Sequence, residues 1–206
     1  MDTFDQNHIW HPYAKIPNEV KTHVVESADG VYLNLAGDKR VIDGMSSWWS
    51  AIHGYNHPTL NQAAQAQLGK ISHVMFGGLT HEPAITLAKT LVDITPEHLS
   101  KVFFTDSGSV AVEAALKMAL QYWHNQGQSK KHKFVTIRGG YHGDTFGAMS
   151  VCDPNNGMHH LFSGVLPKHY FVQSPSMVAM DEALQDLALT LQQNADSIAA
   201  MILEPV

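Results

Sequence analysis

The chain has 206 residues, and its 44% hydrophobic and 16% charged residues are typical of a globular protein and exclude a disordered tail. Thirteen basic and nineteen acidic residues give a formal net charge of −6, which leaves no basic stripe for nucleic acid. No apolar run of about 18 residues is present to span a membrane. The single cysteine, Cys152, favours a reducing compartment. We therefore expect a cytoplasmic protein that binds neither nucleic acid nor a membrane.

An irregular segment followed by a small antiparallel meander is predicted for the first 50 residues. Asp29-Gly30 between apolar runs is a strong hairpin signal, because both residues tolerate a positive φ. A second glycine turn follows at residues 36–39. The predicted strands are residues 22–26, 31–35 and 40–43.

From residue 57 the hydrophobic spacing alternates between that of helices and that of short buried strands. Strands that alternate with helices indicate a parallel sheet covered on both faces. The fold class is therefore α/β with an antiparallel piece at the N-terminus. The predicted helices are residues 57–71, 80–94, 110–123 and 181–193, and the predicted strands are 102–104, 133–137, 170–172 and 198–203.

The loop at residues 105–109 is a candidate phosphate site. Gly108 permits close approach of a ligand, Ser109 offers a hydroxyl, and the free N–H groups of a helix N-terminus attract anions. The loop is neither G-x-G-x-x-G nor a P-loop, so neither a dinucleotide nor ATP is indicated. Its residues alone leave it equally open that Ser107 or Ser109 is a plain N-cap and Gly108 a turn residue.

A second loop, residues 138–145, follows the strand at 133–137 and places Tyr141 among three glycines. We call it the tyrosine loop. An aromatic ring in such a loop can stack on a flat heteroaromatic cofactor. Taken alone, the loop favours a surface turn whose aromatic ring covers the end of the sheet.

A third candidate site is aromatic and lies where the meander meets the helical part. Trp48 and Trp49 are either core residues or one wall of an apolar substrate cavity, to which Tyr13 would add a phenol. Fourteen histidines raise the question of a metal, but the sequence has no H-E-x-x-H motif and no Cys/His cluster. We expect no metal site.

Three motifs together resemble the class III aminotransferases that use pyridoxal 5′-phosphate (PLP). They are D-S-G-S-V-A-V-E at residues 106–113, Y-H-G-D-T-F-G-A-M-S at 141–150 and L-E-P-V at 203–206. Within this family, W-H-P-Y at 10–13 and D-G-M-S-S-W-W at 43–49 resemble the branch of biotin synthesis. The resemblance implies a fold-type I transferase. Residues 1–50 would then belong to its small domain, and residues 51–206 to a PLP-binding large domain with a mostly parallel sheet.

The resemblance also implies roles for the residues that match the family motifs. Phosphate binding would fall to the helix start, ring stacking to the tyrosine loop, and substrate contacts to the aromatic residues near the N-terminus. The residues are Gly108, Ser109 and Tyr141 for the cofactor, Tyr13, Trp48 and Tyr141 for the substrate, and Trp49, Asp144 and Glu204 as further candidates.

Two functional residues of the family match no position in the chain. These are the Schiff-base lysine and the aspartate that pairs with the pyridine nitrogen and keeps the ring an electron sink. Lys117 belongs to the helix of the phosphate loop and Lys133 begins a strand. We expect both functional residues to follow Val206, the chain to be inactive by itself, and the longer enzyme to be a homodimer.

The implied reaction is PLP-dependent transfer of the amino group of S-adenosylmethionine to 8-amino-7-oxononanoate, which gives 7,8-diaminononanoate. Two alternatives stay open. Another class III aminotransferase, acting on ornithine, 4-aminobutyrate or a similar ω-amine, would share the phosphate and tyrosine loops. A non-catalytic relic of the fold would also lack a matching lysine.

Overall fold

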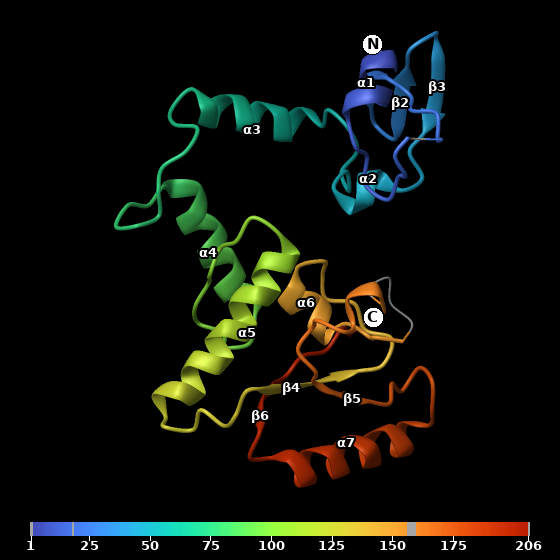
Figure 1. Ribbon diagram of the computed structural model, residues 1–206. Coiled ribbons are helices and arrows are strands. Elements are labelled where there is room, and N and C mark those ends of the chain that lie inside the picture. The colour runs from blue at the N-terminus through green and yellow to red at the C-terminus, as the bar shows by residue number, and fades with distance from the viewer. Residues whose placement is uncertain (1, 18, 156–159, 206) are drawn as a thin grey trace. The chain divides into compact units, whose positions relative to one another are not determined.

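The computed structural model describes residues 2–17, 19–155 and 160–205 (Figure 1). The chain separates into two compact units, residues 1–89 and 90–206. This division is not that of the predicted domains, whose boundary at residue 50 stays a prediction.

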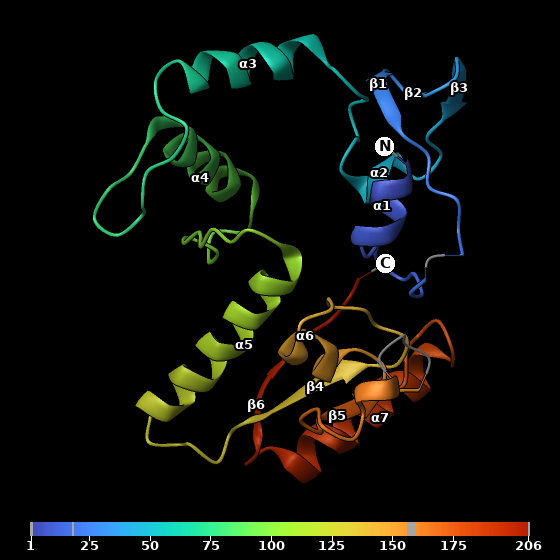
Figure 2. The ribbon, with the colours of Figure 1, turned by 45° about the horizontal axis from the view of Figure 1, so that its top comes forward.

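A three-stranded antiparallel sheet organises the first unit (Figure 2). Its strands are β1 (Val25–Asp29), β2 (Tyr32–Leu35) and β3 (Lys39–Ile42), paired in the order β1-β2-β3. Gly30 turns the chain between β1 and β2 with a φ of 55°. The predicted meander is confirmed. The helices that begin in this unit are α1 (Asp2–His8), α2 (Ser46–Trp49), α3 (Pro58–Leu68) and α4 (Glu82–Ile94).

The helix predicted at residues 80–94 is confirmed as α4, which begins at Glu82. His81 caps it, because its Nδ1 accepts the Ala84 N–H at 3.3 Å. Ala84 is buried, but Leu87, on the same apolar face, is 50% exposed. Helical spacing defines an apolar face but supplies no element to cover it.

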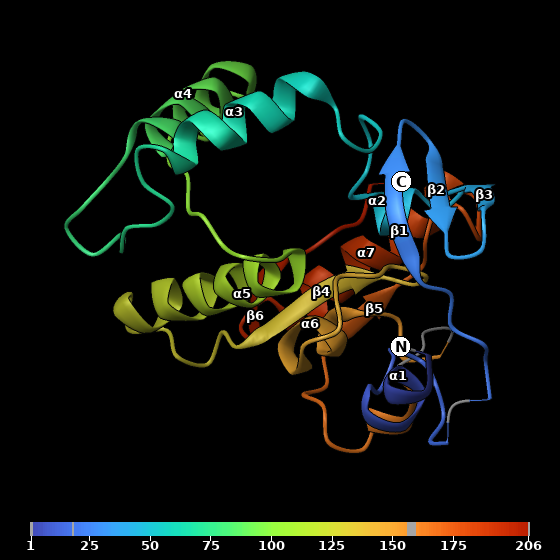
Figure 3. The ribbon, with the colours of Figure 1, turned by 90° about the horizontal axis from the view of Figure 1, so that it is seen from above.

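The second unit is built on a parallel sheet with the order β5-β4-β6. These strands are β4 (Lys133–Ile137), β5 (Tyr170–Val172) and β6 (Ile198–Met201). Helices α5 (Gly108–Asn125) and α6 (Phe146–Val151) lie on one face of this sheet, and α7 (Met180–Asn194) lies on the other (Figures 1 and 3). A short 3-10 turn, η1, covers His160–Phe162. The α/β prediction is confirmed.

The central strand β4 carries the core of this unit. Val135 is fully buried and Phe134 is 3% exposed, and Phe134 packs with Leu116 of α5 and Val151 of α6. The Trp123 indole N–H donates to the Ala199 carbonyl at 2.6 Å and so ties α5 to β6. The carboxyl end of β4, where the tyrosine loop begins, is therefore anchored on a rigid base.

The strand predicted at residues 102–104 is wrong. This segment joins neither sheet, and the side chain of Phe103 is 68% exposed. An apolar run forms a strand only where a neighbour completes its hydrogen bonds, and no described segment pairs with it. The strand predicted at 198–203 is confirmed, but β6 ends at Met201. No described helix is long and apolar enough to cross a membrane.

The stability of the second unit is expected to depend on His169, which is packed against the core. Its Nδ1 accepts the Phe134 N–H at 3.3 Å, and its ring meets the Phe134 ring edge-on. Burial, helped by the charges of Lys133 and His132, lowers the pKa of His169 to about 4. A histidine in the unfolded chain titrates at about 6.5, so protons bind the unfolded chain first. Stability present above pH 6.5 should be lost as the pH falls from about 6.5 to about 4.

Urea unfolding at pH 7, 6 and 5 measures this effect by comparing the wild type with His169→Gln, whose side-chain oxygen also accepts the N–H. The variant should lose less of its free energy of unfolding over that interval. Equal losses in the two proteins would show that His169 titrates alike in the folded and unfolded chain.

Candidate active site

The first turn of α5 forms one wall of a pocket of about 490 Å³. Ser107 is the N-cap, and its Oγ accepts the Val110 N–H at 3.2 Å. Gly108 and Ser109 are the next two residues and line the pocket. Their N–H groups have no acceptor among the described residues. These groups lie at the positive end of the helix dipole. The turn is therefore both a capped helix start and a place where an anion can bind.

The tyrosine loop forms another wall of the same pocket. Tyr141 and Gly143 line it, together with Glu204, which follows β6. The Tyr141 N–H donates to Glu204 Oε2 at 3.0 Å, and the Tyr141 hydroxyl donates to Asp144 Oδ2 at 2.9 Å. Four sequence-predicted residues, Gly108, Ser109, Tyr141 and Glu204, thus surround one space, and Asp144 is bonded to the tyrosine.

Ser109 holds the tyrosine loop directly against α5. Its Oγ accepts the Asp144 N–H at 3.0 Å, which leaves the hydroxyl proton available to a ligand. Gly143 has a φ of 124°, and a Cβ at this position would lie 2.9 Å from Ser109 Cα. Only glycine fits this backbone conformation and this close approach.

The half-buried His142 and the buried Cys152, behind the loop, are electrically neutral at pH 7. Burial lowers the pKa of His142, although Glu204 opposes the shift, and His142 Nε2 lies 3.2 Å from Thr136 Oγ1. Burial raises the pKa of the Cys152 thiol, and Cys152 Sγ accepts the His142 N–H at 3.1 Å. Cys152 therefore supports the loop as a thiol and does not serve as a nucleophile.

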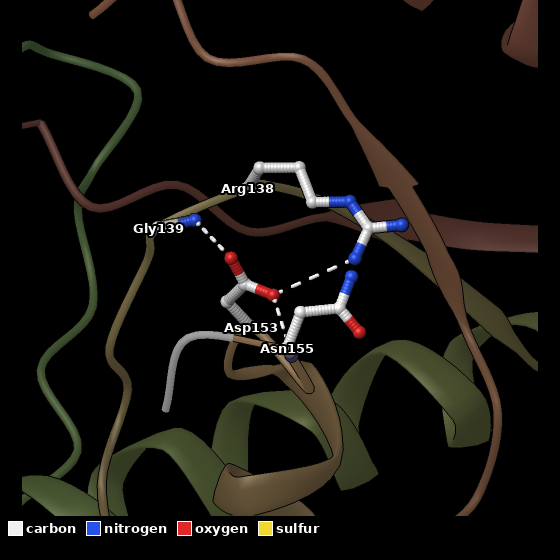
Figure 4. A network of polar contacts seen from close by, with 4 residues as sticks. All are labelled: Arg138, Gly139, Asp153 and Asn155. Atoms are coloured by element: carbon white, nitrogen blue, oxygen red, sulfur yellow. Dashed lines mark hydrogen bonds and ion pairs between the residues drawn. The ribbon is translucent and has the colours of Figure 1, made fainter. Parts of the chain in front are cut away.

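A buried carboxylate anchors the start of the loop (Figure 4). Asp153 is 2% exposed, and its side chain accepts the N–H groups of Gly139 at 2.8 Å and Asn155 at 2.9 Å. The guanidinium of Arg138 lies 3.5 Å from Asp153 Oδ1. Burial opposes ionisation of Asp153, but the two N–H donors and Arg138 outweigh it and hold the pKa below its ordinary value.

The aromatic residues predicted to bind substrate belong to the first unit. The rings of Tyr13 and Trp48 meet edge-on with centroids 6.2 Å apart, and the side chains of Trp48 and Trp49 are 62% and 76% exposed. They are not core residues of that unit. That Trp48 and Tyr13 line the same cleft as Tyr141 stays a prediction.

The turn that carries the tryptophans has a left-handed backbone from Ser46 to Trp49, with φ between 45° and 66°. Such backbone costs about 1–2 kcal/mol per non-glycine residue and persists only where other contacts hold it. Asp43 Oδ2 accepts the hydroxyls of Ser47 at 3.0 Å and Tyr55 at 2.5 Å. The Tyr55 hydrogen bond lowers the pKa of Asp43. Asp43 thus fixes the turn that presents both indoles.

Sequence reasoning missed the groups that hold the tyrosine loop, namely Glu113, Cys152 and Asp153, and the supporting His142. Glu113 lies one helical turn after Ser109, a spacing that places both side chains on one face of α5. That spacing was the available signal. Within the described part of the chain, no group of three or more His, Cys, Asp or Glu residues is placed to hold a metal ion.

The family model described as "Aminotransferase class-III" matches residues 14–206. The chain belongs to the class III aminotransferases. A relative from Buchnera aphidicola subsp. Acyrthosiphon pisum, named adenosylmethionine-8-amino-7-oxononanoate aminotransferase, is 52% identical over 98% of this chain and 48% of its own length. The chain thus spans about half the length of the curated relatives it matches.

Solved structures of this class have the same fold as the chain. The enzyme of that name from Methanocaldococcus jannaschii is 36% identical, with a TM-score of 0.87 over 97% of this chain and 45% of that one. An amine transaminase from an uncultivated Pseudomonas species, solved in a PLP-bound form, is 30% identical, with a TM-score of 0.83 over 97% and 48%. The fold-type I prediction is confirmed.

The pocket between α5 and the tyrosine loop fits the cofactor of class III aminotransferases. The N–H groups of Gly108 and Ser109, which have no acceptor among the described residues, and the Ser109 hydroxyl supply donors for a phosphate dianion. A Cβ on Gly108 would meet nothing within 4 Å, so the space before the helix is open to a ligand. The Tyr141 ring, 48% exposed, offers a stacking surface in the same pocket.

Asp153 is expected to contribute strongly to the stability of this class III site. Replacing it with alanine leaves the Gly139 N–H and Arg138 without their acceptor, which should cost about 2–4 kcal/mol. Asp153→Asn keeps one oxygen acceptor and should cost less. Urea unfolding at pH 7 measures both, with Asp196→Asn, a change at an exposed site, as the control.

The effect of Asp153 should also depend on pH. Its pKa is lower in the folded chain than in the unfolded chain, so its contribution is complete above about pH 4 and is lost as the pH falls further. The difference between the wild type and Asp153→Asn should therefore narrow from pH 5 to pH 3.5. A difference that stays constant would mean that the carboxylate gains nothing from its partners by being ionised.

Proposed function

We propose that this chain supplies the phosphate-binding and ring-stacking part of the PLP site of an aminotransferase. The whole protein would transfer the amino group of S-adenosylmethionine to 8-amino-7-oxononanoate and form 7,8-diaminononanoate. One observation carries the proposal: Gly108 and Ser109 at the start of α5 and the ring of Tyr141 line the same pocket.

Each residue of the pocket has a distinct task in this proposal. The N–H groups of Gly108 and Ser109 and the Ser109 hydroxyl hold the phosphate at the positive end of α5. Tyr141 covers one face of the pyridine ring and excludes water from it. When bound, PLP supplies the electron sink that makes transfer of an amino group possible. These residues thus orient the cofactor. The lysine predicted after Val206 would move the proton during transfer of the amino group.

Asp144, Tyr13 and Trp48 are proposed to contact the substrates. Asp144 presents a carboxylate beside Tyr141, and this charge favours a cationic donor such as S-adenosylmethionine, whose sulfonium is positive. Tyr13 and Trp48 present aromatic surface that suits the apolar chain of 8-amino-7-oxononanoate. Trp49, on the same turn, is a further candidate.

The second candidate function is that of another ω-aminotransferase. It is favoured by the structural likeness to the amine transaminase at 30% identity. The relative at 52% identity carries the name of the S-adenosylmethionine-dependent enzyme and supports the first candidate. A homodimer and a cytoplasmic location belong to the same proposal, and the reducing compartment agrees with a single buried thiol.

A donor comparison tests the proposal on the protein expressed from its complete coding sequence and loaded with PLP. With 8-amino-7-oxononanoate as acceptor, S-adenosylmethionine should yield 7,8-diaminononanoate, and glutamate, ornithine and 4-aminobutyrate should yield at least about tenfold less, because one well-placed contact is worth that factor. Mass spectrometry of the product gives the measurement.

A matched pair of variants tests the proposed substrate contact. Trp48→Ala should raise KM for 8-amino-7-oxononanoate, whereas Trp123→Phe, a change at a tryptophan with no proposed substrate contact, should not. Faster turnover with glutamate or ornithine would favour the ω-aminotransferase, and no turnover with any donor would contradict both candidates.

A further inference from the structure

The contact between α5 and the tyrosine loop has two matched halves along one face of the helix. Ser109 accepts the Asp144 N–H at 3.0 Å, and Glu113, four residues later, accepts the Gly147 N–H at 2.7 Å. Residues four apart on a helix lie above one another on the same face. The loop and the start of α6 are therefore bonded to α5 at two points one helical turn apart.

Each point of contact falls on or beside a glycine. A Cβ on Gly143 would lie 2.3 Å from Ser109 Oγ, and a Cβ on Gly147 would lie 2.3 Å from Glu113 Oε2. At Gly143 a larger residue would also meet the backbone of Ser109, whereas at Gly147 it would displace the end of the Glu113 side chain from its hydrogen bond. Glu113 is half-buried in this contact, and its carboxylate also offsets the positive end of α6.

We infer that Glu113 is a positioning residue that locks the Tyr141 loop to the phosphate-binding start of α5. The inference rests on the proposed function, because it assigns the phosphate contact to α5 and the ring contact to Tyr141. Glu113 contacts neither the phosphate nor the pyridine ring. It fixes the position of Tyr141 relative to the start of α5, so that one rigid ligand can contact both.

The loss of the Glu113 contact should affect the binding of two ligands differently. Inorganic phosphate needs only the first turn of α5, whereas pyridoxamine 5′-phosphate needs that turn and the Tyr141 ring together. Pyridoxamine 5′-phosphate also has no aldehyde, so it cannot attach to surface lysines. Loss of the Glu113 contact should therefore weaken binding of pyridoxamine 5′-phosphate and leave binding of phosphate unchanged.

The test uses two replacements of similar size in the apo form of the protein expressed from its complete coding sequence. Glu113→Gln keeps an oxygen that accepts the Gly147 N–H, whereas Glu113→Met fills the volume and removes the acceptor. Gln121→Met, at an exposed position of the same helix, is the control. Calorimetric titration gives both dissociation constants, and NMR hydrogen exchange gives the protection of the Gly147 amide without ligand.

Glu113→Met should raise the dissociation constant of pyridoxamine 5′-phosphate about tenfold, the effect of one lost hydrogen bond to a charged group, and should speed exchange at Gly147. The constant for phosphate should stay within about twofold. Glu113→Gln and Gln121→Met should resemble the wild type. A purely structural role would weaken both ligands alike.

Equal weakening of both ligands, unchanged binding of pyridoxamine 5′-phosphate, or unchanged exchange at Gly147 in Glu113→Met would overturn the inference alone. If the wild type binds pyridoxamine 5′-phosphate no more tightly than phosphate, the proposed cofactor site fails, and this inference fails with it. A Glu113→Met chain that does not fold, beside a Glu113→Gln chain that does, would show a structural role and so contradict positioning.

Discussion

Side chains from other elements hold the backbone of the segment from Gly139 to Gly147, which pairs with no strand in the described part of the chain. Five of its N–H groups donate to side-chain acceptors on Ser109, Glu113, Cys152, Asp153 and Glu204. A loop of this kind would otherwise leave polar groups without partners next to a buried sheet, at a cost of about 1–3 kcal/mol for each. The position of Tyr141 follows from these bonds.

The same bonds connect the elements that make the pocket. Acceptors come from α5, from the segment after α6 and from the segment after β6, so the loop joins three parts of the second unit. Parallel strands place such segments together at their carboxyl ends, which is where α/β proteins bind ligands. Gly143 and Gly147 then allow the loop to lie against α5 at the distance a hydrogen bond needs. The start of α5 and the ring of Tyr141, which are far apart in sequence, thus line one pocket.

Local signals predicted the elements that local forces determine. The bounds of β4 and β5 match the prediction, because short β-branched and aromatic runs between turns are distinctive. Residues 102–104 have the same signal, yet they lack a partner strand among the described residues. The residues of an apolar run do not determine whether another strand pairs with it. The acceptors Asp153 and Glu204 escaped prediction as loop anchors for a related reason: their partners lie across the fold, and only Glu113, in register with Ser109, was within reach of helical spacing.

A crystal structure of the chain soaked with pyridoxamine 5′-phosphate tests the central claim most directly, because the claim is that the α5 start and the tyrosine loop hold one ligand. The phosphate should lie within hydrogen-bond distance of the Gly108 and Ser109 N–H groups, with the pyridine ring stacked on Tyr141 and the bonds to Asp144 and Gly147 intact. Phosphate density at any other place, or a ring that leaves Tyr141 without contact, would contradict the account.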